Sequence, residues 1–89
     1  MLQPRQIERI VKGFANHRRI EIMQLLGRAP GLSLMAIARR LKIDFRTAGE
    51  HVRRLNLAEL VSKRHQGAAV IHALSDLGRR VLKFLRTLE

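Results

Sequence analysis

Two helical patterns joined by only three residues restrict the fold of this chain more than any other feature. An apolar pattern at helical spacing follows Ser33 and ends at Leu41, and a second one starts after Asp44. Serine and aspartate are favourable N-caps, because their side-chain oxygens accept hydrogen bonds from the free N–H groups of a helix start. Helices with so short a connection pack at a steep angle. The sequence therefore predicts a helix-turn-helix over residues 33–57.

The remaining segments predict three further helices. Pro4 can open the first, Asn16 can cap the second, and Ser75 can cap the last. The second helix should stop at the stretch "GRAPG", residues 27–31, which contains two glycines and one proline.

Two short runs between these helices predict a β-hairpin, with strands over residues 61–65 and 69–74 and a turn at Gln66–Gly67. No repeat, linker or low-complexity tract interrupts the chain. We therefore expect one domain over residues 1–89, mainly α-helical with a β-hairpin. Its expected parts are the helix-turn-helix at 33–57, the hairpin at 60–74 and terminal helices at 4–14 and 76–88.

The charge of the chain favours a polyanionic partner. Eighteen lysine and arginine residues stand against seven acidic residues, which gives a net charge of +11. Ribosomal and membrane-surface proteins share this trait, but it is typical of nucleic-acid binding. Three phenylalanines without tryptophan or tyrosine offer few platforms for single-stranded bases. Double-stranded DNA is the partner that we expect.

The helix expected at 45–57 separates apolar from charged residues. At ~100° per residue, one side carries Phe45, Ala48, Val52 and Leu55 and should face the core. The opposite side carries Arg46, Thr47, Glu50, Arg53, Arg54 and Leu57, with His51 on a flank. Most basic helix sides are simply solvated. Here the helix follows a short turn and precedes the basic hairpin residues Lys63, Arg64 and His65, so we favour a role in a DNA groove.

Four segments resemble the ArsR-like winged helix-turn-helix repressors, over residues 15–78. "ANHRRIEIMQLL" is similar to the second helix of that family, and "LSLMAIARRLKID" to its third helix and turn. "TAGEHVRRLNLAELV" resembles the recognition helix, and "IHALSDLG" the passage from the wing to the last helix. Each motif is degenerate alone, but four in the same order and register are a strong indication of the fold.

The resemblance implies a homodimeric transcriptional regulator, expected to be a repressor, whose recognition helix enters the major groove and whose wing follows the backbone or minor groove. The groove-facing positions that match are Thr47, Gly49, Glu50, His51 and Arg54, and the wing positions are Lys63 and Arg64. The first and last helices form the dimer interface in such proteins.

Both terminal helices of this chain do carry wide apolar sides. The residues concerned are Ile7, Ile10, Val11, Phe14, Val81, Phe84, Leu85 and Leu88. A chain of this size buries only about 60–65% of its unfolded surface, and it has no cysteine with which to form disulfides. We therefore assign these residues to a dimer interface, with a purely intramolecular core as the alternative.

Several positions depart from the family pattern. Gly49 stands in place of a serine, and Lys42 and Glu59 stand where glycine is common, so both turns are expected to be strained or differently shaped. Glu50 places a negative charge on the expected groove side. It could accept a hydrogen bond from cytosine N4, or it could pair with Arg46, Arg53 or Arg54.

The sequence argues against metal sensing, catalysis and membrane insertion. There is no cysteine, and the histidines at 17, 51, 65 and 72 have no nearby ligand at metal-binding spacing, so we expect no metal and no cofactor. No nucleophile motif or phosphate-binding loop indicates an enzyme. No apolar run is long enough to span a bilayer, and no secretory signal starts the chain, so we expect a cytoplasmic protein.

Two alternatives to a sequence-specific regulator stay open. The high charge, together with Gly49 and Glu50, would also suit a nonspecific architectural protein that coats DNA. The apolar Leu57 on the charged side would suit a winged helix that binds another protein.

Overall fold

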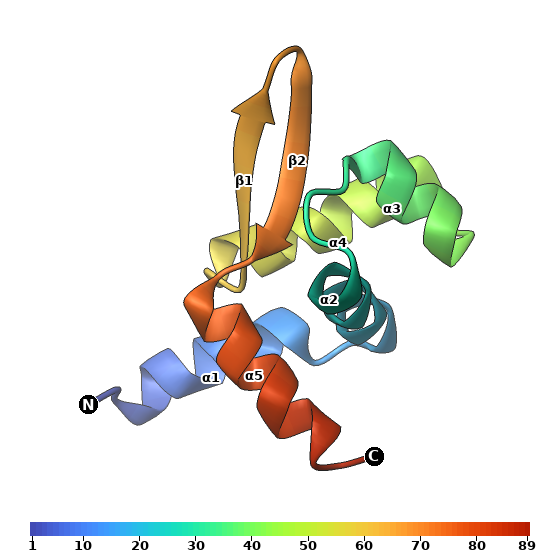
Figure 1. Cartoon of the computed structure of the whole chain (residues 1–89). Helices are drawn as coiled ribbons and strands as arrows, with labels where there is room; N and C mark the ends of the chain where they lie inside the picture. The colour runs from blue at the N-terminus through green and yellow to red at the C-terminus, as the bar shows by residue number, and fades with distance from the viewer.

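The computed structural model describes all residues, 1–89, as five helices and a two-stranded antiparallel sheet (Figure 1). The elements are α1 (Pro4–Phe14), α2 (His17–Arg28), α3 (Leu34–Leu41), α4 (Phe45–Leu57), β1 (Val61–Gln66), β2 (Ala69–Leu74) and α5 (Asp76–Arg86). Their order confirms the expected mainly α-helical fold with one hairpin.

The capping residues found in the sequence begin four of the helices. The Asn16 side chain accepts hydrogen bonds from two backbone N–H groups of α2, and Asp44 does the same for α4. Ser33 and Ser75 each accept one backbone N–H at the start of α3 and α5. These bonds satisfy donors that a helix start would otherwise leave free, so the helix starts were predictable from local sequence alone.

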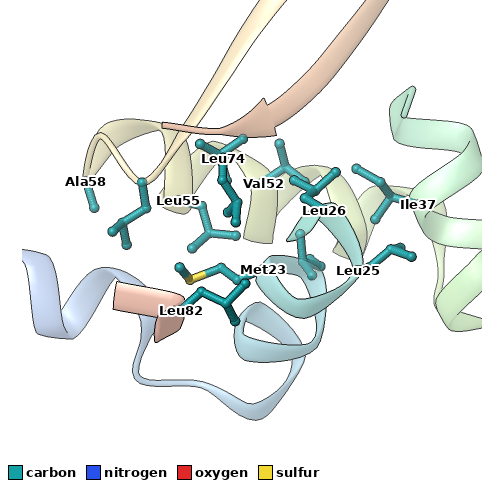
Figure 2. Close-up of a cluster of buried hydrophobic side chains, with 12 residues drawn as sticks. Met23, Leu25, Leu26, Ile37, Val52, Leu55, Ala58, Leu74 and Leu82 are labelled. Carbon is teal, nitrogen blue, oxygen red and sulfur yellow. The ribbon is translucent and has the colours of Figure 1, made fainter. Parts of the chain in front are cut away.

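The hydrophobic core lies where α2 crosses α4, the base of the hairpin and α5. Met23 of α2, Leu55 of α4 and Leu82 of α5 come together there, as Figure 2 shows. Leu82 was not among the expected apolar residues of the last helix. The full cluster consists of Ile22, Met23, Leu25, Leu26, Ile37, Val52, Leu55, Ala58, Leu60, Val61, Leu74 and Leu82.

The end of α2 corrects one expectation. The helix continues through Gly27 to Arg28, instead of stopping at the glycine. A Cβ on Gly27 would lie 2.5 Å from Leu82 Cδ2, so this glycine allows α2 and α5 to approach each other. Its role is close packing, and the helix ends only just before Pro30.

Two residues with positive φ shape the turns on either side of α4. Lys42, between α3 and α4, has φ 56°, and Glu59, between α4 and the hairpin, has φ 62°. This left-handed region favours glycine, so the expectation of strained turns at these two positions is confirmed. The Ser75 hydroxyl donates a 2.6 Å hydrogen bond to the Glu59 carbonyl oxygen, which fixes the second turn against the start of α5.

The hairpin projects away from the helices, with a buried base and an exposed tip (Figure 1). Val61 pairs with Leu74 at the base, and Gln66 pairs with Ala69 next to the tip. The strand β1 therefore includes Gln66, and the turn lies one residue later than expected, at residues 67–68. A bridge between Leu32 and His72 ties the segment before α3 to the hairpin, with His72 N donating to Leu32 O over 2.8 Å.

Candidate nucleic-acid interface

The helix α4 presents its charged side to solvent. Ala48, Val52 and Leu55 are buried on the opposite side, as expected from their spacing. The exposed residues include Arg46, Thr47, Glu50, Arg53 and Arg54. The helix can therefore approach a partner without giving up any contact with its own core.

Phe45 is a correction to that pattern, because it is 46% exposed. It is the first residue of α4, whereas the buried side of this helix begins at Ala48. Spacing along the helix placed Phe45 on the correct side, but the core does not extend that far.

Glu50 pairs with two neighbouring arginines in the free protein, which identifies its partners among the three arginines considered. Its Oε1 accepts from Arg53 Nη2 over 2.8 Å and from Arg54 Nε over 3.1 Å, and its Oε2 accepts from Arg53 Nε over 3.1 Å. The hydrogen bonds from Arg53 and then Arg54 lower the pKa of Glu50 from 4.5 to about 2. Arg46, four residues before Glu50, does not take part, and an acid that precedes its cation in the helix is the more favourable order.

The three arginines are thus available to different degrees. Arg46 has no carboxylate partner in the chain. Arg54 bonds Glu50 through Nε only, so both of its terminal nitrogens are free. Arg53 uses Nε and Nη2, which is one whole edge of its guanidinium. Each of the three keeps the edge formed by its terminal nitrogens for a two-hydrogen-bond contact with guanine, but Glu50 restrains Arg53 more than Arg54 and does not restrain Arg46.

Gly49 and His51 lie on the flanks of α4, not on its exposed side. Gly49 is half-buried, and a Cβ there would lie 3.3 Å from Leu34 Cδ2 of α3. His51 is also half-buried, and its Nδ1 is shielded from solvent without a hydrogen-bond partner. Burial, followed by the charge of Arg19, lowers the pKa of His51. These two residues are therefore poor candidates for direct contact with a groove.

The basic residues of the wing are exposed, but they do not share one face. Lys63, Arg64 and His65 are consecutive in β1, so Arg64 lies on the opposite face of the hairpin from the other two. Only part of this set can face a duplex at one time.

Three further exposed cations lie on and directly after α3, where the sequence had not placed candidate residues. Arg39 and Arg40 are exposed in the last turn of α3, and Lys42 follows in the connection to α4. These cations are evident in the sequence as "ARRLK", but only the packing of α3 against α4 shows that their helix lies next to the helix that carries Arg46.

A second group of cations lies at the other end of α4. Arg9 and Lys12 of α1 and Arg19 of α2 line a hollow of about 240 Å³ together with Arg54 and Leu57. Arg19 is fixed there, because its Nη1 donates to the backbone oxygens of Lys12 and Gly13 over 3.1 and 3.0 Å. Leu57 is 63% exposed at the edge of this hollow, as the sequence predicted.

The terminal helices leave fewer apolar residues exposed than the assigned dimer interface contains. Leu85 is only 9% exposed and belongs to the core of its own chain. Ile10, Phe14 and Val81 are partly buried against that core. The substantially exposed members are Ile7, Val11, Phe84 and Leu88. The dimer assignment therefore depends on these four.

No three residues of the histidine, cysteine, aspartate and glutamate types lie close enough together to hold a metal ion. None of the helices combines the length and the apolar character needed to cross a bilayer.

No protein-family model and no curated protein matches this sequence. Among solved structures, the chain is similar to the homodimeric winged helix-turn-helix DNA-binding domain of Mb0332 from Mycobacterium bovis, a possible ArsR-family regulator. The TM-score is 0.84 at 25% identity, covering 93% of this chain and 77% of that one. Reduced HlyU from Vibrio cholerae gives a TM-score of 0.81 at 25% identity, covering 93% and 87%. Streptococcus pneumoniae FabT, solved with DNA, gives 0.73 at 14% identity over 79% of this chain and 51% of FabT, a likeness of fold alone.

These likenesses agree with the resemblance seen in the sequence, which assigned α3 and α4 to a helix-turn-helix and β1 and β2 to a wing. The chain is a winged helix-turn-helix protein whose structural relatives are ArsR-family and HlyU-type transcriptional regulators.

Proposed function

We propose that this protein is a transcriptional regulator that binds double-stranded DNA in a sequence-specific manner. The observation that carries the proposal is the exposed, arginine-bearing side of α4, directly opposite the residues that anchor this helix in the core. The similar solved structures include DNA-binding regulators, which supports the same assignment.

The mechanism follows from the shape and charge of α4. An α-helix fits the major groove of B-DNA, which is ~12 Å wide. Arg46 and Arg54 have free N–H groups for base edges or phosphates, whereas the Thr47 hydroxyl donates a long hydrogen bond of 3.5 Å to Asp44. Glu50 sits among them as an acceptor, and on a base edge its natural donor is the amino group of cytosine. We therefore expect G·C pairs in the preferred site.

Affinity and register would come from the cations around this helix. We assign phosphate contacts to the exposed residues Arg39, Arg40 and Lys42 and to one face of the wing, which carries either Lys63 or Arg64. Phosphate contacts orient a protein on the duplex but do not distinguish sequences. The net charge of +11 implies that binding weakens steeply as salt rises.

We further propose a homodimer formed through α1 and α5, with Ile7, Val11, Phe84 and Leu88 as the apolar contacts. A two-fold dimer would place two copies of α4 about one helical turn of DNA apart, so the preferred site would be palindromic. We also propose that the protein is cytoplasmic and that it acts as a repressor.

Selection of bound fragments from random duplexes tests the proposal. We expect a palindromic sequence to be enriched, and we expect it to outcompete random duplex by about a thousandfold or more at 0.15 M salt. The architectural alternative predicts no enrichment, and it is favoured by one observation, the engagement of Arg53 and Arg54 by Glu50. Equal affinity for all duplexes would support that alternative, and absence of duplex binding at low salt would exclude both.

A further inference from the structure

A hollow lies on the side of α5 that faces the end of α2. Its volume is about 500 Å³, within the range of ~300–1,000 Å³ that is usual for small-molecule sites. Its apolar lining comes from Leu26, Leu74 and Leu82, which are also members of the buried core. An apolar group placed there would contact leucine side chains that the core already holds in place.

The polar lining of this hollow is entirely cationic. Arg79, Lys83 and Arg86 of α5 contribute to it, and no acidic residue does. Arg79 is already engaged by the Leu74 carbonyl oxygen and by Asp76. Lys83 and Arg86 have no ion-pair partner in the chain. The hollow thus combines an apolar lining with two unpaired positive charges one turn apart on the same helix.

The hollow would stay open in the proposed dimer. The helix α5 ends at Arg86, two residues earlier than expected, so Leu88 lies just beyond it. Phe84 stands two residues before Arg86 and therefore points to nearly the opposite side of the helix. The helix α5 separates the two surfaces, so dimer formation on one side does not require closure of the other.

From these features we infer that the hollow between α2 and α5 is a binding site for an amphipathic monoanion, a carboxylate with a short hydrocarbon tail. The tail lies against Leu26, Leu74 and Leu82, and the carboxylate accepts hydrogen bonds from Lys83 and Arg86. A carboxylate fits because both cations can donate to its two oxygens, and charged hydrogen bonds are stronger than neutral ones.

Decanoate is a suitable probe, with decanol and decyltrimethylammonium as uncharged and cationic controls. The chain has no tryptophan or tyrosine for intrinsic fluorescence, so binding is followed by amide chemical shifts in NMR and by calorimetry. We expect saturable shifts at Gly27, Leu74 and the residues of α5 with decanoate, and much weaker binding of both controls. Decanol binding as tightly as decanoate would overturn the assignment of an anion site.

Two double variants separate the site from the overall charge. K83Q/R86Q removes both rim charges, and R39Q/R40Q removes two charges from exposed positions on α3. We expect the first to weaken decanoate binding by about tenfold or more and the second to leave it nearly unchanged. Equal weakening by both, or no saturable binding to the unmodified protein, would overturn the inference. All four positions are exposed, and circular dichroism checks that both variants fold.

A regulatory consequence rests on the proposed function. The hollow is bordered by Pro30, in the connection from α2 to α3, and by Ala73 and Leu74 at the base of the wing, so a ligand there contacts segments that lead into the helix-turn-helix and the wing. Decanoate should change the duplex affinity of the unmodified protein and not that of K83Q/R86Q. Decanoate binding without any change in duplex affinity would refute regulation and leave the site standing. Failure of the ligand-free protein to bind duplex would instead refute the proposed function.

Discussion

Replacing Glu50 with glutamine should make the protein bind random DNA more tightly and choose among sequences less well. The amide keeps the shape of the side chain, but it removes the only negative charge on the exposed side of α4 and raises the net charge by one. The carboxylate now accepts three hydrogen bonds, of 2.8, 3.1 and 3.1 Å, from Arg53 and Arg54. A neutral amide holds two guanidiniums far less firmly.

The size of the effect follows from the number of arginines released. Each phosphate neutralised by a cation adds about 0.9 to the slope of log K against log salt concentration, which is roughly fivefold in affinity at 0.15 M salt. Release of Arg53 and Arg54 should therefore steepen the slope by up to about 1.8 and raise affinity for random duplex about 5- to 30-fold. Preference for the selected sequence should fall by about tenfold, because arginines free to reach phosphates no longer hold one orientation toward base edges.

Fluorescence anisotropy with labelled selected and random duplexes, over a series of salt concentrations, measures both quantities. Glu8→Gln is the matched control, since Glu8 forms an exposed ion pair with Lys12 on α1 at 3.3 Å and is replaced with the same change of charge. If E50Q gained no more affinity for random duplex than E8Q, or gained equally on both duplexes, the assigned role of Glu50 would be wrong.

Three further predictions concern stability and titration. Gly78→Ala should lower the free energy of unfolding by about 1–3 kcal/mol in urea denaturation, because the new Cβ would overlap the Leu60 carbonyl oxygen. The matched control Gly49→Ala, whose Cβ meets only the end of a leucine side chain, should change this free energy by less than about 1 kcal/mol. Similar losses for both variants would contradict the prediction. Lys42→Gly should raise the melting temperature and stabilise the protein by about 0.5–1 kcal/mol, since φ at this residue is 56°, and a loss of stability would count against strain there. An NMR titration of His51 should give a pKa below 6.5, because burial disfavours the imidazolium. The unfolded chain then binds the proton more readily than the folded chain, so stability decreases as the pH falls below 6.5. A titration midpoint at or above 6.5 would refute the assignment.

The sequence predicted those parts of the structure that depend on neighbours in the chain. The caps at Asn16, Ser33, Asp44 and Ser75 work within one helical turn, and each begins the helix that it was expected to begin. The solvent-facing arginines of α4 followed from helical periodicity. The unusual turns at Lys42 and Glu59 were predicted because each of these residues stands where glycine is common and the backbone adopts a positive φ.

The predictions that were wrong or incomplete concern contacts between segments that are distant in the sequence. Periodicity gives the direction in which Phe45 points but not how far the core extends, and it cannot show that Gly49 faces α3. Gly27 resembled a helix end because its contact with Leu82 comes from the far end of the chain. The sequence could not show which arginines pair with Glu50, since Arg46, Arg53 and Arg54 all stand at helical spacing from it.

The DNA-facing role of α4 is tested most directly by two triple variants of equal charge. R46Q/R53Q/R54Q removes the arginines of the proposed interface, and R5Q/R28Q/R80Q removes three exposed arginines from α1, α2 and α5. At 0.15 M salt, loss of three phosphate or base contacts should weaken duplex binding by about a hundredfold and flatten the salt slope by up to about 2.7. The account predicts this for the first variant and a loss at least ten times smaller for the second. Equal losses would show that charge alone, and not the exposed side of α4, holds the duplex.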